Sequence, residues 1–488
     1  MKKNSIIKAI TITFLVYAVL SWIIPGGAFQ EATFTKADTT TPVGIGDLFI
    51  YGISTATTSI FVLIAVILLL IGGLYGVMNK TGVYQKVVEG AVKKFSGKEK
   101  AFLIISILVF AILASLTTLT LPLFVMVPFF VAVILLLGYD KMTAMLSTVG
   151  AILVGNMGSI FGYNNGGYNY VNYFFKLKMT DNIVFKICLF VLLIAVLIFF
   201  TLRTSKLEKK EIKKDKKTNK KKEEKAETKE EIIVPLYKKV EESKKSAMPL
   251  VIVVVLSVII SLVAMYNWAG TLNTDKTIFT TWHENITSVK LNGYPLFANL
   301  LGSVNPFGSW SNYEFSMLLI IVILVIGFVY NLKVKETFEA AVEGMKEMLP
   351  VAVVAALANV LLLVVNSAGT TYFATIYDFF FKLNKGFNFI IMSVVSFIGS
   401  IGYSDFPYLL NSVYAPITAK YAKHIKEIVF IIQAMYGYAM LIVPTSVGLV
   451  AGLQYLNISF KEWFKENWRL LVSLLLVTLI MIIIMVLI

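Results

Sequence analysis

The stretch GAILVGNMGSIFGYNNGGYNYVNYFF, residues 150–175, decides how this chain folds. It follows an apolar run long enough to enter a membrane, yet it is rich in glycine and carries Asn156, Asn164 and Asn165. Inside a bilayer, non-helical backbone is tolerated only where it is buried in protein or lines a cavity. The stretch therefore predicts a broken transmembrane helix whose freed polar groups bind a solute. The alternative is an intact helix whose glycines allow close helix packing.

The composition places the rest of the chain in a membrane as well. Of the 488 residues, 57% are hydrophobic, and the mean hydropathy is +0.79. A helix of about 20 apolar residues crosses the hydrocarbon core. Candidate spans are 6–24, 55–77, 182–203, 248–266, 314–332, 349–366 and 469–488, and the regions 101–138, 141–165 and 389–450 are interrupted. The sequence therefore predicts an all-α polytopic membrane protein.

The net charge of +15 is concentrated in one segment and the loops. Residues 203–245 hold 17 of the 44 Lys and Arg but 10 of the 29 Asp and Glu. Lysines interleaved with glutamates, without aromatic residues, argue against a nucleic-acid partner. We predict a solvated cytoplasmic linker, 205–247, between a first half, 1–204, and a second half, 248–488. Because Lys-rich segments stay inside, the N-terminus is also predicted to be cytoplasmic.

Each half contains a predicted re-entrant hairpin with a polar tip. Region 101–138 has lysines beyond both ends and Pro122 near its centre, and two full spans are the alternative. The second hairpin, 389–417, carries Ser404 and Asp405, and a carboxylate at membrane depth is usually functional. An Asp at the interface, outside the hydrocarbon, is the alternative. The span count puts both ends of this hairpin outside, which fits poorly with the lysines at 382, 385, 420, 423 and 426.

The two halves show the same order of elements in opposite orientation, which predicts an inverted repeat. Pro444 interrupts an apolar run in the second half, as the glycines do in the first, with a simple proline kink as the alternative. Inverted repeats with broken helices are typical of transporters with a binding site at the bilayer midplane. For the tip of the first hairpin, the alternative is that the Ser and Thr hydroxyls bond back to their own helix and bind no solute. The predicted substrate-binding residues are Ser115, Thr117, Thr118, Asn156, Ser159, Asn164, Asn165, Ser404, Asp405, Thr445 and Ser446.

These elements predict a secondary active transporter of a small polar organic solute, coupled to Na⁺ or H⁺ or acting as an exchanger. The chain has no G-x-x-x-x-G-K-[ST] motif for ATP, and its two histidines and one cysteine lack metal-ligand spacing. We expect no cofactor beyond the coupling ion, with Na⁺ held near Gly155, Asn156, Asp405 and Thr445. Helix N-termini favour a carboxylate and Asp405 favours an ammonium group, so an amino acid fits both. An intramembrane enzyme and a channel are the alternatives.

Several stretches resemble the YfcC-like family, which belongs with the anaerobic C4-dicarboxylate carriers (DcuC) of the ion transporter superfamily. They are LSWIIPGGAF (20–29), YGVMNKTGVYQKVVEG (75–90), LGYDKM (137–142), TFEAAVEGMKEMLPVAVVAALA (337–358) and LIVPTSVGLVAGLQYLNISFKEWFK (441–465). The resemblance covers nearly the whole chain apart from the charged linker. The chain departs from the family at both hairpin tips, SLTTLTLP (115–122) and GYSDFP (402–407).

The resemblance implies a cation-coupled, elevator-type carrier with two re-entrant hairpins. Basic amino acids, dicarboxylates or other small carboxylates are the implied substrates. A homodimer is the implied assembly. The Lys-rich composition is typical of a bacterium with a single plasma membrane, where we expect the protein to lie.

Overall fold

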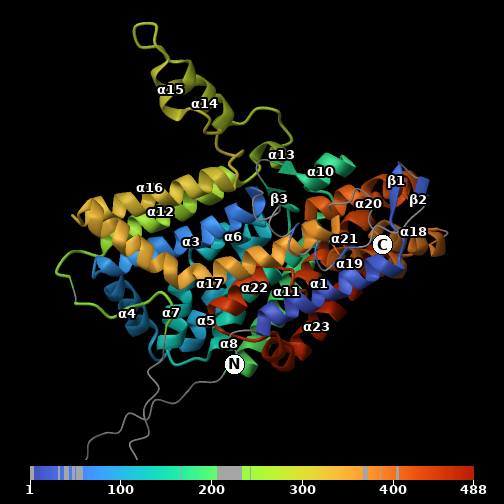
Figure 1. Ribbon diagram of the computed structural model, residues 1–488, viewed down its shortest axis with the longest axis horizontal. Helices are drawn as coiled ribbons and strands as arrows, with labels where there is room; N and C mark the ends of the chain where they lie inside the picture. The colour runs from blue at the N-terminus through green and yellow to red at the C-terminus, as the bar shows by residue number, and fades with distance from the viewer. Residues whose placement is uncertain are drawn as a thin grey trace, which may run out of the picture.

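The computed structural model describes residues 5–30, 33–37, 43–44, 46, 50, 59–165, 168–205, 234–241, 243–366, 372–384, 386–402 and 406–488. Long helices lying side by side form the body of the protein (Figure 1). Seven described helices are long and apolar enough to cross a membrane. They are α1 (Ser5–Ile23), α3 (Ser59–Lys80), α5 (Glu99–Thr117), α11 (Ile183–Thr204), α12 (Met248–Met265), α16 (Asn312–Val329) and α23 (Phe460–Leu487).

Six of these seven helices coincide with predicted spans, and the seventh, α5, is the first arm of the predicted hairpin 101–138. Their outer faces carry large exposed apolar side chains, such as Ile252 and Leu256 on α12 and Leu324 and Phe328 on α16. Phe328 is 83% exposed, which a soluble protein would rarely tolerate in the middle of such a surface. The all-α polytopic fold class is therefore confirmed.

The predicted span 349–366 is only part of a longer helix. It is continuous with the amphipathic segment before it, and together they form α17 (Val334–Asn366), a helix of 33 residues with Pro350 inside it. At 1.5 Å per residue the helix is about 50 Å long. Only the apolar second half was predicted as a span, because the first half is charged. The helix does not end at Pro350, although proline cannot donate the backbone hydrogen bond expected there.

Helices α3 and α17 pack antiparallel, with their backbones in close contact. A Cβ atom on Gly72 would lie 2.5 Å from the carbonyl oxygen of Gly344, and one on Gly76 would overlap the carbonyl oxygen of Ala340. Small residues spaced in this way let two membrane helices approach more closely than larger side chains allow. Because α3 belongs to the first half and α17 to the second, this contact joins the two halves of the chain.

The end of the predicted linker is packed against the protein. Residues 234–241 and 243–246, which we call the strap, cross the C-terminal end of α3 and the first half of α17. The Lys238 ammonium lies 2.7 Å from Glu343 Oε1 and 2.8 Å from Glu347 Oε1. The Asn79 side chain donates to the carbonyl oxygen of Leu236, at 3.0 Å, and accepts from the backbone N–H of Lys238, at 3.2 Å.

These bonds differ from the solvated linker that the charge pattern predicts. The stretch VPLYKKVEESKKS, 234–246, has too few apolar residues to predict packing against the protein. Its partners are polar groups on helices distant in the sequence, which a local pattern does not reveal. The hydrogen bond to Lys238 holds the pKa of the Glu343 carboxyl below its usual value. The earlier part of the predicted linker, 206–233, lies outside the described residues.

The interrupted regions are built from several helices each, most of which are short. The first consists of α5, α6 (Thr120–Phe124) and α7 (Val127–Leu136). The second contains α8 (Lys141–Met145), the π-helix η2 (Leu146–Gly150) and α9 (Ala151–Met157), followed by β3 (Asn164–Asn165), β4 (Tyr168–Asn169) and α10 (Tyr170–Phe175). The third contains α19 (Phe389–Gly402), α20 (Phe406–Lys420), the 3₁₀ helix η3 (Ala422–His424), α21 (Ile425–Met440) and α22 (Val447–Tyr455).

The two arms of the first hairpin differ in structure. Helix α5 has 19 residues, enough in length for a full span, whereas the return is divided between α6 and α7. Thr118, in the left-handed region with φ 56°, makes the turn. The depth of this turn in the bilayer, and with it the re-entrant interpretation and the inverted repeat, stay predictions.

Most of the remaining elements lie at one end of the body. Strands β1 (Gly27–Gln30) and β2 (Thr33–Lys36) form an antiparallel pair beside α18 (Tyr372–Leu383). An arm made of α14 (Ile278–Ser288) and α15 (Leu296–Leu301) projects away from α12 and α16, with the short α13 (Trp268–Leu272) at its base (Figure 1). Helix α4 (Tyr84–Phe95) lies at the opposite end, beside the strap (Figure 1).

Gly344→Ala tests the contact between α3 and α17. The new methyl group would overlap the Gly72 backbone, so we expect the free energy of unfolding to fall by about 1–3 kcal/mol. Thermal unfolding of the detergent-purified protein measures the change. Gly90→Ala on α4 is the control, because nothing lies within 4 Å of its Cβ position and alanine favours a helix. Equal melting temperatures for the two variants would contradict the close contact.

Candidate functional site

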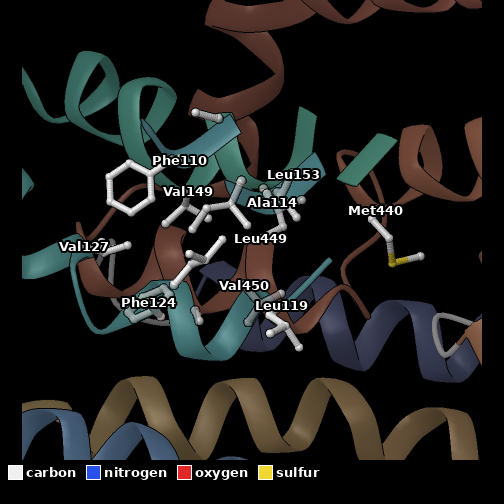
Figure 2. Close-up of a cluster of buried hydrophobic side chains, with 14 of the residues drawn as sticks. Phe110, Ala114, Leu119, Phe124, Val127, Val149, Leu153, Met440, Leu449 and Val450 are labelled. Carbon is white, nitrogen blue, oxygen red and sulfur yellow. The ribbon is translucent and has the colours of Figure 1, made fainter. Parts of the chain in front are cut away.

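An apolar cluster brings three of the four predicted polar elements together. Figure 2 shows Phe110 and Ala114 of α5, Leu153 of α9, and Leu449 of α22 facing one another. All four side chains are at most 3% exposed. The tip of the first hairpin, the first broken helix and the second broken helix therefore meet in the core, as the sequence predicts.

Asn156 links the first broken helix to the first hairpin. Its side-chain Nδ2 donates to the Thr120 hydroxyl at 2.9 Å, and its backbone carbonyl accepts from the Tyr163 hydroxyl at 3.2 Å. Asn156 is 6% exposed, and its Oδ1 atom has no hydrogen-bond partner among the described residues. A buried amide oxygen without a partner costs free energy, which a bound polar ligand would recover.

The helix break after Met157 is held by Ser115. The Ser115 hydroxyl donates to the carbonyl oxygen of Gly158 at 2.8 Å, and the Ile160 N–H donates to the carbonyl oxygen of Ser115 at 3.0 Å. These bonds satisfy backbone groups that the broken helix leaves free, as membrane interiors require. Ser115 therefore has a structural role in the described state.

The glycines of the stretch 150–175 divide between the two predicted roles. A Cβ atom on Gly155 would lie 2.5 Å from the carbonyl oxygen of Ala111, so this residue serves close packing of α9 on α5. Gly158 similarly lies against the backbone of Phe190 on α11. Gly162 has φ +80°, a conformation that favours glycine, and it follows the break. Packing and unwinding thus coexist in one stretch.

The second break lies between α21 and α22, around Pro444. Thr445 and Ser446 are both buried, and the Ser446 hydroxyl accepts from the Leu449 N–H at 3.4 Å as the N-cap of α22. Gly448, in the first turn of α22, would place a Cβ 3.0 Å from the methyl group of Thr120. The N-terminus of α22, which carries partial positive charge, therefore lies beside the first hairpin.

The alternative interpretation holds for two hydroxyls of the first tip. Thr117 donates back to the carbonyl oxygen of Leu113 at 2.7 Å, and Thr118 donates to the carbonyl oxygen of Thr117 at 2.7 Å. Both side chains satisfy their own helix end. Thr120, one turn further on, is the hydroxyl that contacts Asn156.

Other buried polar atoms, at the first break and within α21, have no described partner. Ser159 is 4% exposed and its hydroxyl makes no hydrogen bond among the described residues. Gln433, on α21, is equally buried and its Nε2 is likewise without a described partner. Sequence reasoning missed Gln433, although a lone glutamine in the apolar run IVFIIQAMYGYAM, 428–440, was a usable signal.

An aromatic group that the sequence reasoning also missed joins the second hairpin to this region. The rings of Tyr163 and Phe406 stack with centroids 4.3 Å apart, and Tyr436 contacts them edge-on at 5.0 and 4.9 Å. Phe406 is the first residue of α20, which forms the second arm of the second hairpin. The start of this arm therefore lies beside the segment that follows the first break. All three aromatics lie inside or beside the polar motifs, where they could have been noticed.

The remaining predicted residues are only partly described. Asn164 and Asn165 form β3, which pairs with β4, but the positions of their side chains are not among the described features. Ser404 and Asp405 lie outside the described residues. The structure therefore places Ser115, Asn156 and Ser159 at the first break, and Thr445 and Ser446 at the second break, beside the first hairpin. The proposed role of Asp405 stays a prediction.

The fold defines a multi-pass membrane protein with two broken helices meeting at a hairpin. A model of the family described as C4-dicarboxylate anaerobic carrier (DcuC) matches residues 4–487, so the chain belongs to this family of carriers. Among solved structures, the chain is similar to the YdaH transporter of Alcanivorax borkumensis, at 12% identity and a TM-score of 0.37, over 99% of this chain and 98% of that one. No curated protein sequence matches the chain.

Asn156→Ala tests the link between the broken helix and the hairpin. It removes the bond to Thr120 and the unpartnered Oδ1 atom, so we expect uptake of the transported solute to fall about tenfold or more. Uptake into proteoliposomes, with equal amounts of inserted protein, measures the effect. Thr148→Val is the control, because Thr148 is also buried but its hydroxyl only bonds back to Ala144. Normal uptake by the Asn156 variant would exclude the site.

Proposed function

We propose that this carrier is a secondary active transporter for a small organic solute with a carboxylate group, driven by a Na⁺ or H⁺ gradient or by exchange. The observation that supports the proposal most directly is the pair of buried polar side chains at the first helix break, Asn156 and Ser159, each with an oxygen atom that has no partner among the described residues. Such atoms in a membrane core are costly unless a polar ligand or ion binds them.

The chemistry of the described groups favours an anionic ligand head. The N-terminus of α22 presents free backbone N–H groups and partial positive charge, which stabilise a carboxylate. The hydroxyls of Ser159, Thr120 and Ser446 can donate further hydrogen bonds. This matches the name of the family, whose members are described as C4-dicarboxylate carriers. A dicarboxylate and an amino acid both carry the required carboxylate.

Asp405 would decide between these two substrate classes. A carboxylate close to the bound solute would favour an ammonium group or a coupling cation and would disfavour a second carboxylate. Since Asp405 lies outside the described residues, its role is argued from the sequence alone. An amino acid substrate, with Na⁺ or H⁺ coupling near Asn156 and Thr445, remains the proposal that uses all the predicted site residues.

The orientation and assembly belong to the same proposal. Lys-rich segments favour the cytoplasmic side, so the N-terminus and the strap would face the cytoplasm of a bacterial plasma membrane. A homodimer is expected from the resemblance of the sequence to dimeric carriers.

The first experiment is uptake into proteoliposomes of labelled arginine, lysine, ornithine, neutral amino acids and C4-dicarboxylates, with Na⁺ and pH gradients imposed separately. Saturable uptake of one class that needs a gradient is the expected result. Leakage of every solute without saturation would favour a channel.

Asp405→Asn in the same assay tests the coupling role. We expect gradient-driven uptake to fall about tenfold or more, because the amide cannot carry the charge. Glu284→Gln, an exposed acid on α14, is the control and should transport normally. Full coupled transport by the Asp405 variant would show that another group binds the coupling ion.

A further inference from the structure

A second cavity lies away from the broken helices, where α18, α20 and η3 meet. Its volume is about 520 Å³, within the size range of sites for small ligands. Its lining includes Phe381, Asn384, Phe387, Lys420, Lys423 and His424. None of these residues belongs to the candidate site described above.

The walls of this cavity are fixed by specific contacts. The Tyr421 hydroxyl donates to the backbone carbonyl of Asn384 at 2.9 Å, which ties α18 to the end of α20. The rings of Phe387 and His424 are stacked, with centroids 4.4 Å apart. The cavity is therefore bounded by packed side chains on more than one segment.

Asn384 provides a buried hydrogen-bond donor at this cavity. The residue is 4% exposed, and its Oδ1 atom accepts from the Asn388 N–H at 2.9 Å. Its Nδ2 atom has no partner among the described residues. Because a buried N–H group without an acceptor is unfavourable, a ligand that supplies an oxygen atom would be stabilised here.

The charges around the cavity favour a negative ligand. The Lys420 ammonium lies 5.6 Å from the centre of the Phe381 ring, and Lys423 lines the same space. The neighbouring acids already have cationic partners: Asp378 lies 2.6 Å from Lys382, and Asp181 lies 3.0 Å from Lys426. Glu427 lies 3.8 Å from His424 and offsets part of the positive charge. Two lysines on the lining thus remain available to an anion.

The cavity lies at the end of the molecule opposite the strap. Lys426, two residues after His424, pairs with Asp181, and its carbonyl accepts from the Asn182 side chain. Asp181 and Asn182 immediately precede α11, and the other end of this helix, Thr204, leads into the linker. Because the linker is predicted to be cytoplasmic, the cavity lies on the opposite, external side of the membrane. Lysines are usually enriched on the cytoplasmic side, so a group of them here is unexpected. Ligand binding gives these lysines a reason to be there.

We propose that this cavity binds a small organic carboxylate at the face of the carrier opposite the strap. The lysines would attract the anion, and the Asn384 amide would donate to one of its oxygens. The choice of a carboxylate, rather than another anion, rests on the proposed function. The binding itself does not, because the cavity shares no residue with the candidate site.

The test uses cysteine labelling in a Cys188→Ala background, which removes the natural thiol. Ala422→Cys places a thiol on the exposed lining of the cavity, and Ser288→Cys places one on the arm as a control. Each protein, purified in phosphatidylcholine nanodiscs, reacts with a negatively and a positively charged methanethiosulfonate. We expect the ratio of the negative to the positive rate to be about fivefold higher at position 422.

Two further arms test the ligand and the lysines. Succinate should slow labelling by the negative reagent at position 422 with saturation, while phosphate at the same ionic strength should not. Lys423→Gln and Lys420→Gln should each reduce both the rate ratio and the protection, whereas Lys290→Gln on the arm should reduce neither.

Equal rate ratios at positions 422 and 288, or no protection by succinate, would overturn the proposal. Protection by phosphate or by nanodiscs containing phosphatidylglycerol, but not by succinate, would also overturn it by identifying a phosphate or lipid headgroup site. These readouts do not depend on transport. A carrier that labels as expected but takes up no carboxylate would therefore contradict the proposed function alone.

Discussion

The structure depends on one constraint: a helix that breaks inside a membrane must find new partners for its backbone. The first break meets that requirement with the first hairpin. The second meets it with the Ser446 hydroxyl, which accepts from the Leu449 N–H, and with the Trp463 side chain of α23, which donates to the carbonyl oxygen of Leu441. Ser115 bonds to the backbone of the first break, and Thr120 lies between Asn156 and the first turn of α22. The hairpin therefore supports the first broken helix by hydrogen bonds and packs against the start of α22. The geometry of any solute site at these helix ends depends on those few contacts.

The sequence predicts much of the membrane architecture because hydrophobicity over about 20 residues is a strong local signal. The helix limits agree with the predicted spans to within a few residues at most ends. The first break begins at Gly158 and the second contains Pro444, as the chemistry of these residues requires. The continuity of α17 was not predictable in this way. Its two parts differ in composition, and what joins them is packing against α3, a helix more than 250 residues earlier in the chain.

The candidate site was predictable in its elements but less so in its individual residues. A hydroxyl in a helix end can bond to its own backbone or face a neighbour, and only the tertiary structure separates Thr117 from Thr120. Tyr163, Phe406 and Tyr436 were missed because aromatic residues are common throughout this chain, and their stacking joins three segments. The ion pairs of the strap could not be predicted from the sequence for the same reason, since Lys238 pairs with acids about 100 residues away.

The glycine contact between α3 and α17 restricts how the two halves of the chain can move. Met348 and Met345 already lie against Gly72 and Gly73, where only a hydrogen atom fits, so sliding one helix along the other would bring these side chains against larger residues. Translation along the helix axes is therefore blocked by sterics, while a small rocking about the line of contact leaves the glycines in register. If the protein changes shape during its transport cycle, this pair of helices should serve as the fixed frame, and the displacement should occur in the elements on either side of it.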